Sequence, residues 1–197
     1  MKKAIKISFV MFLICGILYP LVLTGISQIA FNNKANGSII EVNGKEVGSE
    51  IVGQAFEDSR FFKGRPSNVN YNTYENGDSS YRGVATGSSN LSPTNPELIN
   101  RIKNDLNKFL EENPNVKVED IPSDLLTESA SGLDPHISVD GAKVQIPRVS
   151  KSTGISEEEI HKMVDKNTSN KLLGVFGEKT VNVLGVNIEI AKKLGLM

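Results

Sequence analysis

The chain has 197 residues, 39% of them hydrophobic and 23% charged, and its formal net charge is −1. This length and composition predict one folded domain with an appendage. Three of the 22 basic residues precede an N-terminal apolar segment and all 23 acidic residues follow it, so the remainder carries a net charge of −4. That balance excludes nucleic acid as a partner, because binding phosphates needs a basic surface. The single cysteine, Cys15, excludes an intrachain disulfide.

The first predicted element is a membrane-spanning helix. Residues 7–31 are mostly apolar and uncharged, and about 20 such residues suffice to cross the hydrocarbon core of a bilayer. In lipid every backbone group must be satisfied within the segment, so the segment should be helical. The alternative is a signal peptide cleaved after Ser27, but the apolar region of such peptides spans only about 7–15 residues. We therefore expect a retained anchor.

The charges around this helix predict its orientation. Three lysines precede it, namely Lys2, Lys3 and Lys6. Only Lys34 follows closely, so the positive-inside rule keeps the N-terminus in the cytoplasm and exports the rest. We expect a cytoplasmic start and anchor over residues 1–31, a polar linker over 32–38, and an extracytoplasmic domain over 39–197.

Gly16, Pro20 and Gly25 interrupt the apolar segment. Pro20 lacks an N–H and should kink the helix. The two glycines would let another helix approach closely. Two interpretations stand at this point: the three residues pack against partner membrane helices, or they reflect the general frequency of Gly and Pro in such helices.

A β-hairpin is predicted over residues 39–47, because Asn43-Gly44 is a preferred pair for a two-residue turn with positive φ at both positions. Residues 49–62 follow. Their large apolar side chains are expected in the core: Ile51, Val52, Phe56, Phe61 and Phe62.

Residues 64–95 are rich in Gly, Ser, Asn and Pro and contain Tyr71, Tyr74 and Tyr81. A structureless stretch of this length is uncommon in a compact domain and is often functional. A flexible insertion is the other interpretation. The tyrosines speak against it, since aromatic side chains tend to be buried or at interfaces.

Two helices have clear start signals. Asn95-Pro96-Glu97 opens the first, with a cap, a proline in the first turn and an acid at the positive end of the dipole, and Asn113-Pro114 ends it. Its apolar stripe comprises Leu98, Ile102, Leu106, Phe109 and Leu110. The capping box Ser156–Glu159 opens the second. Its buried face is expected to comprise Ile160, Met163 and Val164.

Near the C-terminus, residues 181–184 predict a short strand and residues 187–194 a last helix. The fold class is therefore α+β: one N-terminal transmembrane helix plus a soluble domain with a small sheet and packed helices.

Catalytic motifs are absent from the sequence. It contains no Gly-x-x-x-x-Gly-Lys-Ser/Thr phosphate loop, no Gly-x-Gly-x-x-Gly and no Gly-x-Ser-x-Gly. His136 and His161 lack metal-type spacing and no cysteine of the domain could join them, so we expect no metal site. His161 is expected to be solvated on the surface of its helix.

Residues 129–138 gather hydroxyl groups, one acid and one histidine in a predicted turn, because Asp134 precedes a proline. The turn is either a polar functional site or a buried loop whose side chains satisfy local backbone groups, and the second use is the commoner one. Gln145 and Arg148 are further candidates. Arg148 could bind a carboxylate or phosphate, although a structural salt bridge is the simpler expectation.

Several of these segments resemble the C subunit of the Kdp-type potassium-transporting ATPase, a bacterial P-type pump. The matching pieces are Tyr19-Pro20, Gly53-Gln54-Ala55-Phe56, Phe61-Phe62-Lys63-Gly64-Arg65-Pro66-Ser67, Ser88-Ser89-Asn90-Leu91, Ser131-Gly132-Leu133-Asp134-Pro135-His136-Ile137-Ser138, Gln145-Ile146-Pro147-Arg148-Val149 and Val181-Asn182-Val183-Leu184. They run from the anchor to near the C-terminus, and the block over residues 131–138 is highly specific.

The resemblance implies a non-catalytic subunit in the inner membrane of a bacterial cell. Its implied partners are a potassium-channel-like subunit and an ATP-hydrolysing subunit, and it is needed for their assembly. It also implies a chaperone-like effect that raises the ATP affinity of the hydrolytic subunit. The candidate nucleotide or partner contacts are Ser88, Ser89, Asn90 and Gln145. The candidate partner-contact turn comprises Ser131, Gly132, Asp134 and His136.

The ATP role and the predicted topology point to opposite sides of the membrane. Either the effect on ATP is indirect, through contacts that differ between two states of the pump, or the orientation is reversed. On the outer side the domain could instead shield or shape the potassium entrance. A stand-alone extracytoplasmic domain, binding a ligand with Tyr71, Tyr74, Tyr81 and the 131–138 turn, is the alternative from a different class.

Overall fold

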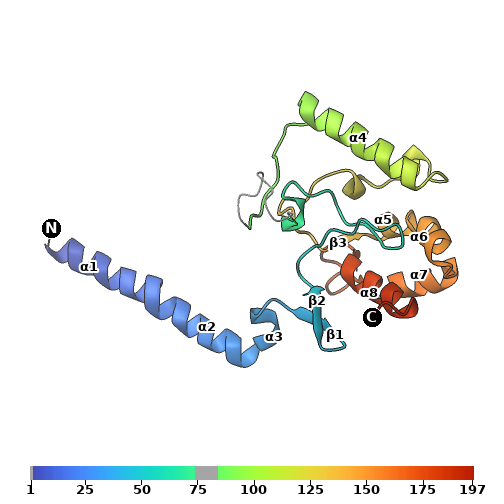
Figure 1. The fold of residues 1–197 in the computed structure, drawn as a ribbon. Helices are drawn as coiled ribbons and strands as arrows, with labels where there is room; N and C mark the ends of the chain where they lie inside the picture. The colour runs from blue at the N-terminus through green and yellow to red at the C-terminus, as the bar shows by residue number, and fades with distance from the viewer. Residues whose placement is uncertain (1, 74–83) are drawn as a thin grey trace. The chain divides into compact units, whose positions relative to one another are not determined.

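The computed structural model describes residues 2–73 and 84–197, and the chain divides into two units, residues 1–39 and 40–197 (Figure 1). Tyr74 and Tyr81 lie outside the described residues. The first unit is the predicted membrane helix with a short helical continuation. The second is a mixed domain of helices and two small sheets, so the expected fold class is confirmed.

The membrane helix consists of α1 (Lys2–Leu13), a π-helical turn η1 (Ile14–Leu18) and α2 (Tyr19–Ala30). It is long and apolar enough to cross a membrane, and none of it is buried within the chain. The wide turn directly precedes Pro20, and the Tyr19 N–H donates to the Ile14 carbonyl five residues back. Since Pro20 has no N–H and its ring crowds the carbonyl four residues earlier, the backbone widens there.

The segment expected to be a linker is partly helical. After Phe31 leaves helical geometry, α3 (Asn32–Ala35) adds one more turn. Its polar side chains bond back to the end of the membrane helix: Asn32 Nδ2 and Asn36 Nδ2 donate to Gln28 Oε1 at 3.1 and 3.2 Å. Residues 32–35 show no helical periodicity of apolar residues, since this turn is held by side-chain amides and not by an apolar face.

The domain opens with the predicted hairpin, β1 (Ile39–Val42) and β2 (Lys45–Ser49), which form a two-stranded sheet. Asn43 and Gly44 both have positive φ, 53° and 75°, as their turn requires. Val42 packs in a small cluster with Leu184 and Ile188. The expectation that Ile51 and Val52 are core residues is wrong. They form an outer turn, 55% and 39% exposed, between β2 and the point where the Gly53 N–H bonds the Leu133 carbonyl.

A second sheet has the antiparallel order β3-β5-β4, made of β3 (His136–Ser138), β5 (Thr180–Asn182) and β4 (Thr168–Ser169). The middle strand places Val181 opposite both Ile137 and Thr168. The strand predicted over 181–184 therefore ends early.

Four helices complete this part of the domain: α5 (Val139–Lys143), α6 (Ile146–Thr153), α7 (Glu157–Lys166) and α8 (Val183–Lys193). The N-cap of α7 is confirmed, because Ser156 Oγ accepts from the Glu159 N–H, and the predicted apolar face is buried. The Glu159 carboxylate pairs with Lys193 Nζ at 2.6 Å, so only this half of the predicted capping box is seen among the described residues. The last helix starts four residues before the expected position. Asn182 Oδ1 accepts from the Gly185 N–H and caps it there.

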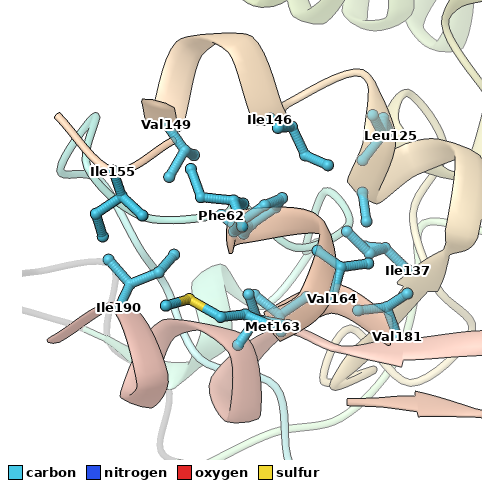
Figure 2. Packing of buried hydrophobic residues seen from close by; sticks show 14 residues of the cluster. Phe62, Leu125, Ile137, Ile146, Val149, Ile155, Met163, Val164, Val181 and Ile190 are labelled. Carbon is cyan, nitrogen blue, oxygen red and sulfur yellow. The ribbon is translucent and has the colours of Figure 1, made fainter. Parts of the chain in front are cut away.

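The core lies among the second sheet and α5–α8 (Figure 2). Phe62 points into this cluster from an irregular segment and is 1% exposed, with Val149, Ile155 and Ile190 nearby. Phe56 and Phe61 are half-buried beside it, so the aromatic part of the predicted 49–62 core is confirmed. This packing anchors the segment that follows Phe62, which builds the candidate site.

Helix α4 (Pro96–Glu112) has the expected cap, since the Glu97 N–H donates to Asn95 Oδ1 at 2.8 Å. It contains no fully buried residue, and its predicted apolar stripe is only half-buried. Its C-terminal end meets α6, because Asn113, the residue that ends α4, accepts a hydrogen bond from Arg148 Nε at 3.1 Å. Three short 3-10 turns complete the described elements: η2 (Asn70–Asn72), η3 (Val118–Asp120) and η4 (Ser123–Leu125).

Candidate functional site

The candidate site centres on the 131–138 turn and the arginine that holds it. Arg65 Nη1 donates to Asp134 Oδ2 at 3.2 Å, and its Nη2 donates to the Glu128 carbonyl at 3.1 Å. The other oxygen of Asp134 accepts from the His136 N–H at 2.9 Å, which closes the turn around Pro135. The local hydrogen bonding expected of this turn is thus confirmed.

Charge and burial act on two ionisable groups here. The His136 imidazole, whose Nδ1 lies 3.6 Å from Asp134 Oδ1, lowers the pKa of Asp134. Hydrogen bonds from the His136 N–H and from Arg65 lower it further, whereas burial of the carboxyl group raises it. The Tyr71 hydroxyl donates to the Arg65 carbonyl. Burial, with a contribution from the charge of Asp134, raises the pKa of Tyr71 to about 12.

Two glycines let three segments meet at this point. A Cβ on Gly53 would lie 2.5 Å from the Asp134 carbonyl oxygen. Gly132 has φ +69°, and a Cβ there would lie 2.8 Å from both the Gly87 carbonyl oxygen and Val69 Cγ2. Only glycine fits these approaches without displacing a neighbour. The Ser67 hydroxyl joins the same junction by donating to the Gly132 carbonyl at 2.6 Å.

The fold brings together two of the predicted sites, the 88–90 segment and the 131–138 turn. The Gly87 N–H and the Thr86 hydroxyl both donate to the Ser131 carbonyl, at 2.8 Å each. Ser89 Oγ and its N–H donate to Glu128 Oε2 at 2.8 and 3.3 Å, and Ser88 Oγ donates to Asn90 Oδ1 at 2.9 Å. The segment that contains Ser88, Ser89 and Asn90 therefore lies against the 131–138 turn and already contacts a carboxylate.

Gln145 belongs to a separate, buried network. Its side chain is completely buried, and all four hydrogen bonds of the amide that the structure gives are internal. Oε1 accepts from the Lys63 N–H at 2.9 Å and from Arg148 Nη2 at 2.8 Å; Nε2 donates to the carbonyls of Lys63 and Gly141 at 3.1 and 3.0 Å. Its amide is fully used in holding the segment after Phe62.

Among the described residues, Arg148 does not form the expected salt bridge. Its guanidinium donates to neutral oxygens instead: Asn113 Oδ1 at 3.1 Å and the carbonyls of Ser59 and Phe61 at 2.6 and 3.1 Å. Burial lowers the pKa of Arg148, partly offset by the charge of Glu112. An arginine has five donors in a fixed fork, so it can join several backbone segments where a single carboxylate could not.

A cleft of about 520 Å³ lies between α4 and the segment over residues 54–71. Lys63 Nζ pairs with Glu112 Oε1 at 2.5 Å between its two walls. Its other lining groups include Phe56, Phe109, Tyr71 and Lys108. A concave surface of this size with convergent polar groups can accept a small molecule or a partner side chain.

The remaining predicted residues lie elsewhere. Gly16 and Pro20 are four residues apart on the membrane helix and so share a face, and a Cβ on Gly25 would meet nothing within 4 Å. His161 is exposed, as expected. Among the described residues, no group of three or more His, Cys, Asp or Glu side chains is placed to hold a metal ion.

Several site residues were missed by sequence reasoning. Arg65, Glu128 and Asn187 had no assigned role, although Arg65 lies in one of the matching blocks. Asn187 lies on α8, 125 residues after Phe62 in the sequence. Its Oδ1 accepts from the Phe62 N–H at 2.8 Å, and its Nδ2 donates to the Phe62 carbonyl at 2.9 Å. Such pairings depend on tertiary placement. The only available signal was the opposite charge of Arg65 and Asp134 within two specific blocks.

Comparison with known proteins shows a match over almost the whole chain. The family model described as KdpC, the c chain of the K+-transporting ATPase, matches residues 1–192. The chain is 58% identical over 205 aligned positions to the potassium-transporting ATPase KdpC subunit of Clostridioides difficile, covering 100% of this chain and 99% of that protein. The corresponding figures are 58%, 99% and 94% for the KdpC subunit of Clostridium kluyveri, and 42%, 98% and 95% for that of Caldanaerobacter subterraneus subsp. tengcongensis. The similarity thus includes the membrane helix.

Proposed function

The chain belongs to the KdpC family, the c chain of the K+-transporting ATPase, and we propose that it serves this pump as a subunit that assembles with the others and does not itself hydrolyse ATP. The membrane helix with its proline-induced wide turn docks among the membrane helices of the partner subunits. The domain stands on the extracytoplasmic side, as the lysines before the helix favour. The channel-like subunit and the ATP-hydrolysing subunit are the proposed partners.

One observation carries the non-catalytic part of this proposal. The specific sequence blocks meet in the domain, yet their polar side chains bond to one another and to the backbone. Gln145, Arg148 and Arg65 all hold chain segments together. A catalytic centre needs groups aimed at a reacting atom. These residues instead support a rigid scaffold whose outer surfaces are available to partners.

The same geometry supports an indirect effect on ATP. A nucleotide-binding loop offers backbone N–H groups to phosphate. Here the Ser89 N–H and hydroxyl face the carboxylate of Glu128, which would repel a phosphate at that place. We therefore propose that the domain changes ATP affinity by binding two states of the pump unequally, which is the requirement for any such shift.

The test is co-expression of the chain with the other pump subunits, followed by purification in detergent through a tag on this chain. The proposal expects the larger subunits to co-purify, and the chain purified alone to show no ATP hydrolysis. Gly16→Leu fills the proposed helix-packing face and should reduce co-purification, whereas Leu21→Val changes volume elsewhere on the helix and should not. A chain that stays alone in co-expression contradicts the proposal.

The cleft beside α4 favours a second candidate, a domain that binds a small ligand by itself. That function expects the melting temperature of the full chain in detergent to rise with ligand in the absence of partners. It also expects Lys108→Ala, at the cleft, to reduce the rise. Lys162→Ala, on the exposed face of α7, is the matched control.

A further inference from the structure

Four large apolar side chains stand in solvent at the tip of the loop between β4 and β5. We call them the apolar tip: Leu172, Leu173, Val175 and Phe176. Their exposed fractions are 70%, 84%, 72% and 64%. Scattered single apolar residues on a surface are normal, but a contiguous group of this kind marks an interaction site. Sequence reasoning assigned nothing to this loop.

The apolar tip is an ordered, hydrogen-bonded turn that projects from the domain as a knob. Leu172 and Phe176 exchange both backbone hydrogen bonds, at 2.8 and 3.0 Å, and the Gly174 N–H donates to the Lys171 carbonyl at 3.0 Å. Its side chains are thus presented by a closed turn. A preformed knob loses less conformational freedom on docking than a flexible loop would.

Leu173 is the residue that local structure explains least. Its φ is +54°, in the left-handed region where Asn or Gly is favoured and a branched apolar side chain is unfavourable. It is also the most exposed member of the tip. A leucine that is locally unfavourable in both respects points to a requirement outside the folded chain, because local rules are broken mainly at functional sites.

The charge around the tip separates a protein partner from a lipid surface. Lys171 Nζ pairs with Glu178 Oε2 at 3.0 Å, which leaves Lys179 as the unpaired cation of this flank among the ion pairs described. Surface binding to lipid is usually supported by a cluster of basic residues. An apolar pocket in a protein needs no such cluster.

We infer that the apolar tip inserts into an apolar pocket on another subunit of the same ATPase and is this domain's docking point in the assembled pump. The inference rests on the proposed function, because it requires the chain to work within a complex. Leu173 and Phe176 are the anchoring side chains. The closed turn fixes their direction.

The test compares tip variants in the co-purification experiment, with the full chain. Leu173→Asn suits the left-handed backbone, so it should leave the melting temperature unchanged or raise it, while reducing co-purification at least about tenfold, as expected on losing a hot-spot residue. Val84→Ser is the matched control, since Val84 is also 84% exposed and lies far along the chain. It should leave co-purification unchanged.

Phe176→Trp adds an independent readout, because the chain has no tryptophan. Its fluorescence should shift to shorter wavelength and become protected from acrylamide only when the other subunits are present. If the shift occurs in vesicles of the chain alone and brominated lipids quench it, the tip binds lipid and the inference is wrong. Unchanged co-purification of Leu173→Asn also overturns it. Failure of the unmodified chain to co-purify overturns the proposed function itself.

Discussion

Arg65 and Asp134, 69 residues apart in sequence, are joined by a hydrogen-bonded ion pair of 3.2 Å that ties the segment after Phe62 to the 131–138 turn. Both side chains are partly shielded from solvent, and Arg65 also reaches two backbone carbonyls. This pair explains why a charged residue sits in each of two specific sequence blocks. It makes the site a structural junction.

Replacing Asp134 by Asn should reduce the free energy of unfolding by about 1–2 kcal/mol at neutral pH, because a charged hydrogen bond is lost and Arg65 keeps its charge. Urea unfolding of the full chain in detergent, followed by near-ultraviolet circular dichroism, measures this. Asp140→Asn is the control, since Asp140 pairs with Lys143 at an exposed site and should matter little.

The pH dependence of that difference has a definite sign. The folded pKa of Asp134 is lowered, so its contribution is present above the ordinary carboxyl pKa and is lost as pH falls through the lower folded value. The gap between the original chain and Asp134→Asn should therefore close below pH about 4. A gap that persists at lower pH would show that the charge of Asp134 is not its cause.

The raised pKa of Tyr71 predicts a loss of stability at alkaline pH. Its folded pKa is raised to about 12 against an ordinary value of about 10, so the neutral hydroxyl stabilises the fold below pH about 10 and that stability is lost between pH about 10 and about 12. Tyrosinate absorbance should show Tyr71 titrating late in the folded chain. Tyr71→Phe should remove it, flatten the fall in stability, and cost about 1 kcal/mol at neutral pH. A titration with no delayed group would contradict this assignment.

Gln145 offers a test between scaffold and nucleotide contact. Gln145→Leu leaves the Lys63 backbone groups and one donor of Arg148 without partners in a buried place, so unfolding should become easier by about 2–4 kcal/mol. Thermal melting in detergent measures the change, with the exposed Lys143→Leu as control. If stability is unchanged while the ATP affinity of the assembled pump falls, Gln145 acts as a nucleotide or partner contact and not as part of the scaffold.

The close approach of Gly132 to the Gly87 carbonyl can be tested separately from the cost of its left-handed backbone. Gly132→Ala adds a clash with the Gly87 carbonyl to the strain of φ +69°, whereas Gly177→Ala has φ +79° with open space around its Cβ. The control should cost about 1 kcal/mol. Gly132→Ala should cost more and release residues 86–90, seen as faster amide exchange at Gly87. Equal effects for both variants would show that the close approach is unimportant.

Sequence alone predicted the elements whose signals are local. The Asn43-Gly44 turn, the Asn95 cap and the Ser156 cap each depend on a few adjacent residues, and all three are present. Helix α6 was missed, because Arg148 on its buried face breaks the apolar pattern and is satisfied only by distant carbonyls. Helix α8 starts at Val183, inside the valine-rich segment 181–186 that is typical of a strand. The boundary between strand and helix is set by Asn182, whose side chain caps the helix.

The candidate site was only partly predictable for the same reason. The family resemblance identified the blocks that meet around the 131–138 turn, but it did not pair Arg65 with Asp134 or place Asn187 beside Phe62. The salt bridge expected for Arg148 was wrong, since burial among carbonyls is not visible in composition. The packing roles of Gly16, Pro20 and Gly25, and the partner role of Ser131 and His136, stay predictions.

The side of the membrane on which the domain lies is tested most directly by protease digestion of sealed, oriented vesicles that contain the assembled pump. An extracytoplasmic domain is digested in right-side-out vesicles and protected in inside-out ones, which is the result we expect from the lysines that precede the helix. Digestion only in inside-out vesicles would place the domain with cytoplasmic ATP. It would contradict the orientation and would remove the topological argument against direct contact with nucleotide.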